Sequence, residues 1–337
     1  MNVVELTRAL VDIESITDHE GEVGSYLLDY LSALAARTGG RAEAMPVKPG
    51  RFNVFACWGA PVATLSTHMD VVPPFFPSRE DDESIYGRGV CDAKGIIASM
   101  IGAAERLLGE GKRDFGLLFV AGEERNSAGA YAAARESRGS RYLINGEPTE
   151  NKLALGSKGT LRYEIAAHGR MAHSAYPELG ESAIDKLLDA LEAIRRIPLP
   201  EDPVLGRGTL NIGTISGGRA PNVVADEARA GIMFRLVSEA DPIRAAVRGA
   251  TAGRAEAIEV LSVPAVRLNA LDDLPTTVVA FTTDIPAFGG AWGEAFLIGP
   301  GDIHVAHTLE EKVPKRQLFE AVDIYARMVK RLTAVSG

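Results

Sequence analysis

The chain has 337 residues, of which 46% are hydrophobic and 24% charged, a composition typical of a soluble globular protein long enough for two domains. Its net charge of −9 and the lack of a basic tract argue against a nucleic acid or an anionic membrane as a partner. Two cysteines are too few for a disulfide framework, and no apolar run approaches the roughly 20 residues that span a bilayer.

The first 150 residues alternate between helical and strand patterns. Residues 2–14 and 20–38 have helical spacing, and the acidic residues of the first segment distinguish it from a signal or transit peptide, so we expect a cytoplasmic protein. A third helix is predicted over 93–110. Four short apolar runs predict strands: 53–58, 63–67, 116–121 and 142–145. Because the third of these runs is apolar on both faces, the pattern predicts an α/β fold with a sheet covered by helices.

Residues 158–263 follow a different order. Patterns for strand, helix, strand, strand, helix and strand succeed one another, which is the βαββαβ order of a ferredoxin-like α+β unit. Two strand patterns and a helix pattern over 315–333 then resume the first arrangement. We therefore predict one discontinuous domain, residues 1–157 and 264–337, and one inserted domain, residues 158–263.

Carboxylates and imidazoles recur where the strands of the discontinuous domain are expected to end. Four sequence islands carry them: His68 and Asp70 in THMDVVP, Asp92 in GRGVCDAKG, Glu123 and Glu124 in AGEER, and Glu147 in NGEPT. A fifth island, IGPGDIHVAHTLEE, adds His304 and His307, of which only one need bind a metal. Two divalent cations about 3.5–4 Å apart need a shared carboxylate and separate His and carboxylate ligands, so the islands predict a two-metal site.

Each island also has a plainer interpretation. His68 with Asp70 could be a satisfied histidine at a strand end, Asp92 a helix N-cap, and Glu123 with Glu124 a solvated acidic turn. Metal binding is favoured because strand after strand ends with the same two ligand types. In that case the carboxylate of Asp70 can fix the ring of His68, and one of the adjacent glutamates can bind a metal while the other acts as general base.

In order and spacing the islands resemble the M20 metallopeptidase family, which includes acetylornithine deacetylase, succinyl-diaminopimelate desuccinylase, aminoacylases and carboxypeptidases. The resemblance covers nearly the whole chain and is most specific in H-x-D-V-V-P, G-R-G-x-x-D-x-K-G, the E-E pair, G-E-P-T and G-P-G…A-H-T-x-x-E. It implies a zinc-peptidase-like catalytic domain with a mixed sheet covered by helices. The inserted βαββαβ domain would serve as a lid and as the dimerisation surface.

The resemblance also implies a role for each ligand. Asp92 would be the carboxylate shared by two divalent cations, and the Asp92–Ala93 peptide bond is expected to be cis. Each cation would have one further imidazole and one further carboxylate: His68 with Glu147 at one, and His307 with Glu124 at the other. Zinc suits these ligand types best, with cobalt and manganese as alternatives.

Further residues would act on the substrate. Glu123 would be the general base, and Asp70 the partner that orients the histidine two residues before it. In the inserted domain, His173 in GRMAHSAYPELGESA occupies the place of a histidine that stabilises the oxyanion in a neighbouring subunit; a surface or core histidine is the alternative. Asn222 and Arg235 would meet substrate oxygens, with a surface ion pair as the alternative for Arg235.

The implied reaction is hydrolysis of an amide bond by a metal-bound water. We expect a homodimeric di-zinc amidohydrolase that removes a short acyl group from a small N-acyl amino acid, similar to acetylornithine deacetylase. A dipeptidase or carboxypeptidase is the alternative within the same chemistry, and Glu147, in place of Asp, is typical of deacylases and carboxypeptidases. From other classes, a non-catalytic ligand-binding relative remains, whereas a dinucleotide-binding domain lacks its glycine fingerprint.

Overall fold

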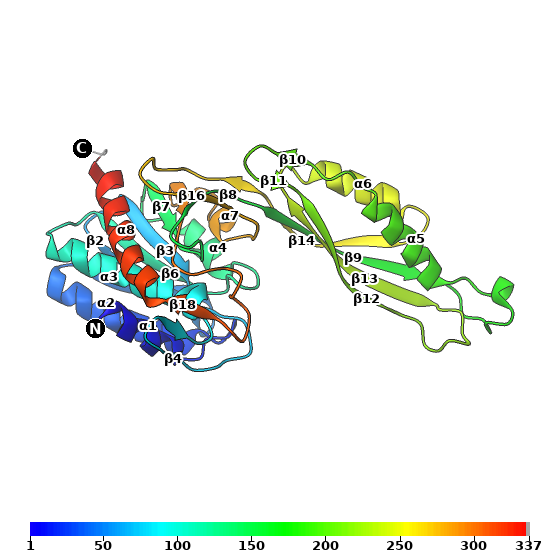
Figure 1. Ribbon diagram of the computed structural model, residues 1–337, viewed down its shortest axis with the longest axis horizontal. Coiled ribbons are helices and arrows are strands. Elements are labelled where there is room, and N and C mark those ends of the chain that lie inside the picture. The colour runs from blue at the N-terminus through cyan, green and yellow to red at the C-terminus, as the bar shows by residue number, and fades with distance from the viewer. Residues whose placement is uncertain (335–337) are drawn as a thin grey trace. The chain divides into compact units, whose positions relative to one another are not determined.

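The computed structural model describes residues 1–334, which divide into two compact units. The first unit contains Met1–Leu155, Leu268–Thr277 and the chain from Thr283 onward, and its elements are largely blue, cyan and red in Figure 1. The second unit contains Gly156–Arg267 and Val278–Thr282, where the sequence predicted an inserted segment over 158–263. No helix among residues 1–334 is long and apolar enough to cross a membrane.

A six-stranded mixed sheet in the order β1-β2-β6-β3-β7-β17 forms the centre of the first unit. The pairs from β6 to β17 are parallel, and β2 is antiparallel to both of its neighbours. The mixed sheet that the sequence predicted is therefore confirmed. Its strands are β1 (Arg41–Lys48), β2 (Arg51–Trp58), β3 (Ala63–His68), β6 (Phe115–Val120), β7 (Tyr142–Asn145) and β17 (Glu294–Leu297).

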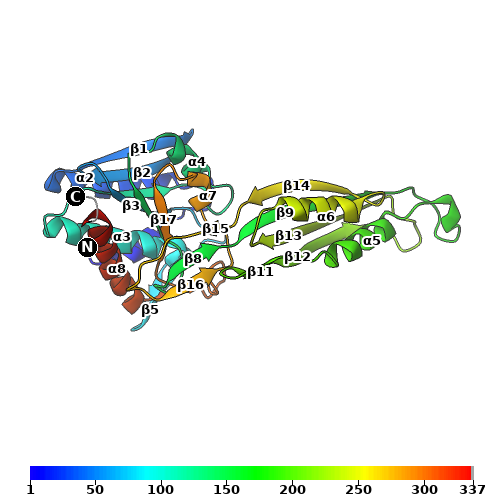
Figure 2. The same ribbon diagram turned by 90° about the horizontal axis from the view of Figure 1, so that it is seen from above.

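Helices cover both faces of this sheet, because side chains of successive strand residues point to opposite faces. Leu117 and Phe119 pack into the core with α1, α2, α3 and α8, whereas Leu118 and Val120 pack into a second core with α4 and α7. The helices α4 and α7 lie side by side (Figure 2). The helices are α1 (Val3–Val11), α2 (Gly21–Thr38), α3 (Gly95–Gly109), α4 (Ala128–Arg135), α7 (Ile285–Phe288) and α8 (Lys315–Ala334).

A small three-stranded sheet brings late and early segments of the first unit together. It has the order β18-β5-β4, with β4 (Arg79–Glu80), β5 (Ser84–Tyr86) and β18 (Lys312–Pro314). Directly after β5 follow the loop with Arg88 and the short helical turn η1 (Val90–Lys94). The Asp92–Ala93 peptide bond in this turn is cis, as the resemblance implied.

The second unit has the element order β9, α5, β12, β13, α6, β14 and an antiparallel sheet in the order β12-β13-β9-β14. Both helices contribute to a single core with the strands β9 and β13, for example through Leu187 and Val247. The elements are β9 (Gly159–His168), α5 (Ala183–Arg195), β12 (Thr209–Gly217), β13 (Glu227–Leu236), α6 (Asp241–Thr251) and β14 (Glu256–Val263).

Shorter elements complete the two units and the passages of the chain between them. β10 pairs with β11, and β8 lies between β15 and β16 in a three-stranded sheet. Their bounds are β8 (Leu153–Ser157), η2 (Pro177–Leu179), β10 (Glu201–Asp202), β11 (Gly206–Arg207), β15 (Val266–Arg267) and β16 (Thr276–Val279).

Candidate metal centre

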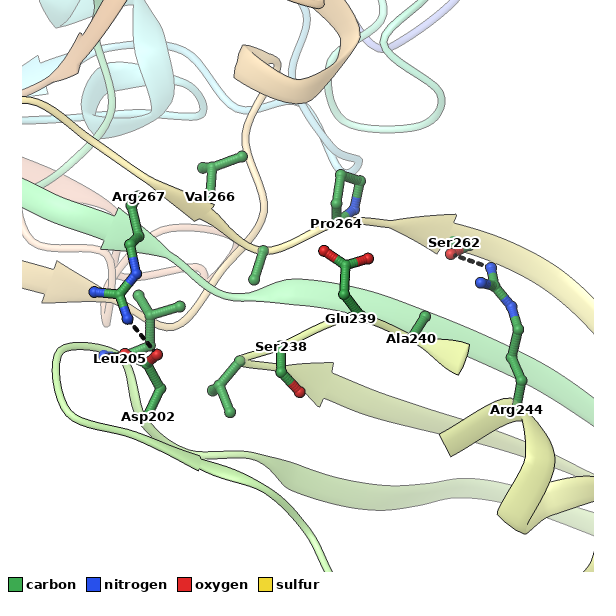
Figure 3. Close-up of a pocket in the computed structure, with 12 residues that line it drawn as sticks. Asp202, Leu205, Ser238, Glu239, Ala240, Arg244, Ser262, Pro264, Val266 and Arg267 are labelled. Carbon is green, nitrogen blue, oxygen red and sulfur yellow. Dashed lines mark hydrogen bonds and ion pairs between the residues drawn. The ribbon is translucent and has the colours of Figure 1, made fainter. Parts of the chain in front are cut away.

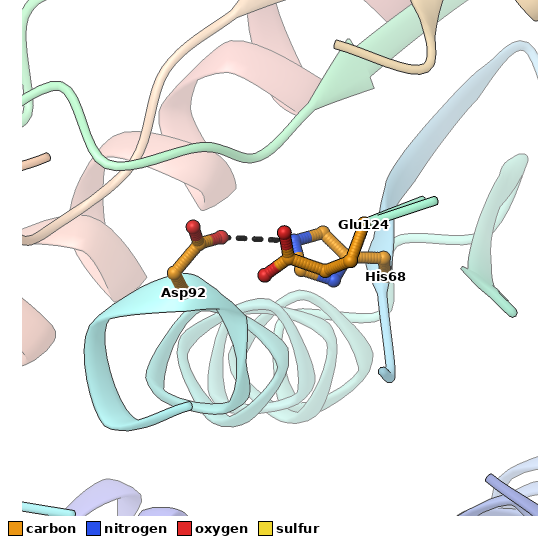
Figure 4. Close-up of side chains that lie close together, drawn as sticks. All are labelled: His68, Asp92 and Glu124. Atoms are coloured by element: carbon orange, nitrogen blue, oxygen red, sulfur yellow. Dashed lines mark hydrogen bonds and ion pairs between the residues drawn. The ribbon is translucent and has the colours of Figure 1, made fainter. Parts of the chain in front are cut away.

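His68, Asp92 and Glu124 converge at the edge of the six-stranded sheet where parallel strands end. His68 is the last residue of β3, and Glu124 follows β6, so the parallel pairing of these strands places both at one edge. Asp92 is supplied by the turn η1. One ligand atom from each of the three side chains lies within 4.8 Å of the others (Figure 4).

Asp92 lies between two imidazoles and presents a different oxygen to each. Its Oδ1 is 2.9 Å from Nε2 of His68, and its Oδ2 is 3.3 Å from Nε2 of His307. The same nitrogen of His307 is 2.9 Å from Oε1 of Glu124. His304, in contrast, is exposed and pairs with Asp302. The structure therefore brings His307, and not His304, beside Asp92 and Glu124.

The second ring nitrogen of His68 is fixed by Asp70 in a way that the sequence did not predict. Nδ1 lies 2.9 Å from the backbone carbonyl oxygen of Asp70 and 3.6 Å from its carboxylate. The carboxylate instead accepts hydrogen bonds from the backbone amides of Gly122, Glu123 and Glu124, at 2.9, 3.0 and 3.2 Å. Asp70 thus orients the imidazole and also anchors the loop with the two glutamates.

Glu147 is buried beyond the end of β7, and its Oε1 has no hydrogen-bond partner within residues 1–334. Burial and the negative charge of Asp92 raise the pKa of Glu147 well above its ordinary value. Burial and the charge of Glu147 do the same to the pKa of Glu123. The pKa of Glu124 is raised by burial and by Asp92. The carboxylates of Glu123, Glu124 and Glu147 therefore lie at least partly buried and close to other negative charge. They can ionise together only if positive charge is present nearby.

The two imidazoles supply positive charge in this structure. Hydrogen bonds to Asp92 and Glu124 raise the pKa of His307 to about 10. Burial alone would lower the pKa of His68, but the nearby carboxylate of Asp70 and the hydrogen bond to Asp92 outweigh it and raise this pKa well above the ordinary value. Burial opposes ionisation of Asp92 as well, yet the hydrogen bonds from both imidazoles keep its pKa low.

These residues fit divalent cations. Imidazole nitrogens and carboxylate oxygens are the ligand types of zinc, cobalt and manganese sites. Both oxygens of Asp92 are directed at different imidazoles, and the unpartnered oxygen of Glu147 is a further buried donor. The arrangement has the composition of a site for two cations with one shared carboxylate.

Asp284 is a buried carboxylate of the same region that the sequence analysis missed. It precedes α7, and burial raises its pKa to about 7, with Asp70 and Glu124 among the negative charges that act in the same direction. The segment TTDIP gives only the signal of an ordinary helix start, an Asp before a Pro. Asp284 increases the negative charge that a cation would balance.

The three remaining predicted site residues lie in the second unit. His173 is exposed, with its Nδ1 accepting a hydrogen bond from the amide of Ala175. The segments of His173 and Asn222 are adjacent, because His173 forms a β-bridge with Val223. Arg235 on β13 is partly buried and donates from Nη1 to Oγ1 of Thr160 at 2.8 Å. Among residues 1–334 the described partner of Arg235 is this hydroxyl, and burial, without any carboxylate, accounts for the lowered pKa of its guanidinium.

A pocket of about 470 Å³ in the second unit is lined by none of these residues (Figure 3). Its arginines are already engaged: Arg267 pairs with Asp202, and Arg244 with Glu259 and Ser262. The carboxylate of Glu239 lies among the lining residues. Because no predicted site residue lines this pocket, we do not assign it to the reaction.

A family model described as peptidase family M20/M25/M40 matches residues 64–331. The chain belongs to this family. As an M20 member it is a metal-dependent hydrolase of amide bonds, which confirms the class of enzyme that the sequence predicted. The alternatives of a non-catalytic relative and of a dinucleotide-binding domain receive no support from this match.

Two relatives of this M20 protein resemble it along nearly the whole chain. A peptidase M20 domain-containing protein of Schizosaccharomyces pombe is 38% identical over 338 residues, covering 97% of this chain and 84% of the relative. A probable carboxypeptidase of Aspergillus terreus is 38% identical over 371 residues, covering 96% and 84%. The relatives are thus named as peptidases and not as deacetylases.

The fold of the M20 protein also matches solved structures. A dinuclear metal-binding peptidase of the M20 family from Bacillus subtilis aligns with a TM-score of 0.70 and 16% identity, covering 97% of this chain and 96% of that chain. The likeness shows a shared α/β fold. M20 peptidases include dinuclear metal enzymes, and the cluster of His68, Asp92 and Glu124 is the candidate metal site of this chain.

Proposed function

We propose that this protein is a two-metal carboxypeptidase that releases an amino acid with a free carboxylate from a short peptide. The observation that carries the proposal is the position of Asp92, with one oxygen toward His68 and the other toward His307 and its partner Glu124. The name of the Aspergillus relative, and those of several similar fungal proteins, supports the choice of a carboxypeptidase among M20 hydrolases.

The metal ligands would be divided between two cations around Asp92. His68 and Glu147 would hold one, and Glu124 and His307 the other. Zinc is the metal we favour, with cobalt or manganese as acceptable substitutes. Bound cations would polarise the scissile carbonyl and acidify a water at neutral pH.

Glu123 would act as the general base of this reaction. Burial and the charge of Glu147 raise the pKa of Glu123, which favours a carboxylate that can take the proton of the attacking water and pass it to the departing amine. Its backbone is held by the Asp70 carboxylate through a hydrogen bond of 3.0 Å. This anchoring supports a fixed orientation of the base.

Residues of the second unit would complete substrate binding. Arg235, for which no carboxylate partner is described among residues 1–334, would bind the carboxylate of the released amino acid, and Asn222 would contact another substrate oxygen. His173 would stabilise the oxyanion of a neighbouring subunit, which requires a homodimer formed through the second unit. The substrate would be a small molecule, with neither nucleic acid nor membrane as a partner.

A second candidate is removal of a short acyl group from an N-acyl amino acid, as in acetylornithine deacetylase. Glu147 supports it, because the family resemblance associates this residue with deacylases as well as carboxypeptidases. Both reactions release an amino acid whose free carboxylate Arg235 could bind. They differ only in what lies on the acyl side of the amide.

The test is hydrolysis of a matched substrate set by the purified zinc-loaded protein. The set contains N-blocked dipeptides, the same dipeptides with a C-terminal amide, unblocked tripeptides, and N-acetyl amino acids including N-acetylornithine. A carboxypeptidase cleaves the blocked peptides with a much higher kcat/KM than the corresponding amides. Preference for N-acetyl amino acids would establish the second candidate, whereas cleavage that requires a free N-terminus and tolerates the amide would refute both.

A further inference from the structure

Arg88 and Glu311 form a buried ion pair between two segments that carry proposed metal ligands. Nη1 of Arg88 is 2.6 Å from Oε2 of Glu311, and each side chain is only 1% exposed. Arg88 precedes Asp92 by four residues, and Glu311 follows His307 by four residues. The ion pair therefore joins the segment that carries Asp92, the proposed shared carboxylate, to the segment that carries His307.

The second carboxylate oxygen of Glu311 holds the backbone at Asp92 itself. Oε1 accepts hydrogen bonds from the amides of Cys91 and Asp92, at 3.1 and 3.3 Å. The carbonyl oxygen of Glu311 also accepts from the amide of Gly87. Glu311 thus contacts both ends of the loop from Gly87 to Asp92, which carries the proposed shared carboxylate.

Arg88 is held in turn from the opposite side. Its Nε donates to the carbonyl oxygen of Pro74 at 3.2 Å, and its guanidinium lies over the ring of Phe76 at 5.0 Å. Immediately after Glu311, β18 pairs with β5, which fixes Lys312 opposite Tyr86. The two segments are consequently aligned by backbone pairing as well as by the ion pair.

Stability alone is a weak explanation for this arrangement. A buried ion pair loses much of its electrostatic gain to desolvation, and apolar side chains of similar volume often stabilise a protein as well. An apolar residue at position 311, however, could not accept the amide hydrogens of Cys91 and Asp92. The carboxylate of Glu311 is therefore needed to hold the backbone of Asp92 in place.

This inference rests on the proposed two-metal function: we propose that the Arg88–Glu311 pair sets the distance between the shared carboxylate of Asp92 and the imidazole of His307. Arg88 and Glu311 are positioning residues, since neither contacts the ligand atoms of the site. A metal site tolerates errors of only about 0.5 Å in its ligands. Loss of the pair should therefore weaken cation binding before it affects the fold.

The test compares cation binding by Glu311→Gln and by the native protein. Glutamine keeps the length of the side chain but removes the charge and one acceptor oxygen. We expect two zinc ions per native chain, and a loss of affinity of about 10- to 100-fold for at least one ion in the variant. Equilibrium dialysis against a competing chelator measures this, and the visible absorption of the cobalt-loaded proteins reports the changed geometry.

Val329→Ala is the matched control, because Val329 is buried in the hydrophobic core on α8 and is neither a proposed ligand nor a partner of Arg88 or Glu311. It should lower the melting temperature and leave zinc affinity and the cobalt spectrum unchanged. Arg88→Lys, a milder change, should weaken cation binding in the same direction and replaces Glu311→Gln if that variant does not fold. Native zinc affinity and an unaltered cobalt spectrum in the folded variant would overturn the inference alone. Fewer than two ions on the native chain would overturn the proposed function as well.

Discussion

Asp70 acts on the metal centre mainly through the backbone of the AGEER loop. Its carboxylate accepts three consecutive amide hydrogens of that loop and the hydroxyl hydrogen of Thr17. Burial opposes ionisation, but the neighbouring His68 imidazole and the hydrogen bonds from Thr17 and the loop hold the pKa of Asp70 below its ordinary value. The charged carboxylate is thus a fixed point for both the imidazole and the proposed general base.

Glu123→Gln should lower kcat by about 10²- to 10⁴-fold, because an amide cannot accept the proton of the attacking water. Cation content should remain at the native level, since Glu123 is not assigned as a ligand. Steady-state kinetics on an N-blocked dipeptide and elemental analysis of the protein measure the two quantities. Glu136→Gln, at an exposed position after α4, is the control and should behave as the native enzyme does. An unchanged kcat in Glu123→Gln would remove Glu123 from the mechanism.

Arg235→Lys should raise KM about 10-fold or more for peptides with a free carboxylate, because lysine cannot form the bidentate pair. The same change should have little effect on peptides whose C-terminus is amidated, which lack the group that Arg235 is proposed to bind. The ratio of the two kcat/KM values measures the interaction. Equal losses on both substrates would show that Arg235 does not recognise the carboxylate.

At the scale of elements, the sequence predicted best those strands that carry ligands. β3, β6 and β7 are short and buried along all or nearly all of their length. Short apolar runs of this kind predict strands without knowledge of the tertiary structure. β1 was missed because only Met45 is buried in it, so neither a run nor a clear alternation appears. α4 was missed because its sequence, AGAYAAAR, has no apolar stripe. Such elements are formed by their tertiary contacts.

The approach of α4 to the sheet depends on Gly129. A Cβ atom there would lie 2.4 Å from Oδ1 of Asn53 and 2.5 Å from backbone atoms of Ala121, the first residue of the AGEER loop. Gly129→Ala should therefore destabilise the protein by about 1–3 kcal/mol and reduce activity by displacing this loop. Chemical denaturation and peptide hydrolysis measure the two effects.

Gly109→Ala is the matched control, since a Cβ atom at the end of α3 meets no heavy atom within 4 Å. Its effect on the free energy of unfolding should be neutral or slightly stabilising, by up to about 1 kcal/mol. If both alanine variants behaved alike, the close contact at Gly129 would have no energetic consequence.

At the scale of the whole molecule, the sequence predicted which residues are candidate metal ligands, because these residues follow strand ends. It did not predict which side chains contact one another in the folded chain. The pairing of Arg88 with Glu311 joins residues 223 positions apart, and no local pattern encodes such a distance. Asp284 was overlooked for the same reason, because its burial among other carboxylates is a property of the folded chain. The assignment of the reaction to a particular substrate also depends on side chains whose sequence context is unspecific, such as Arg235.

Cations should contribute to the stability of the entire first unit. A ligand that binds only the folded state at 100 times its Kd stabilises that state by about 2.7 kcal/mol, and the crowded carboxylates should make this gain large. The melting temperature should therefore rise on addition of zinc and fall with a chelator. His307→Ala, which removes a ligand of one cation, should show a smaller rise. Identical melting curves with zinc and with chelator would contradict cation binding in this unit.

The strand order of the central sheet has a consequence for synthesis of the protein. β17, at residues 294–297, pairs with β7, which leaves the ribosome about 150 residues earlier. While the second unit is being synthesised, β7 therefore remains an edge strand of the sheet with one side unpaired. Such edge strands can pair with other chains. His307 emerges later still, so the proposed cation sites can close only after both β17 and this histidine have been synthesised.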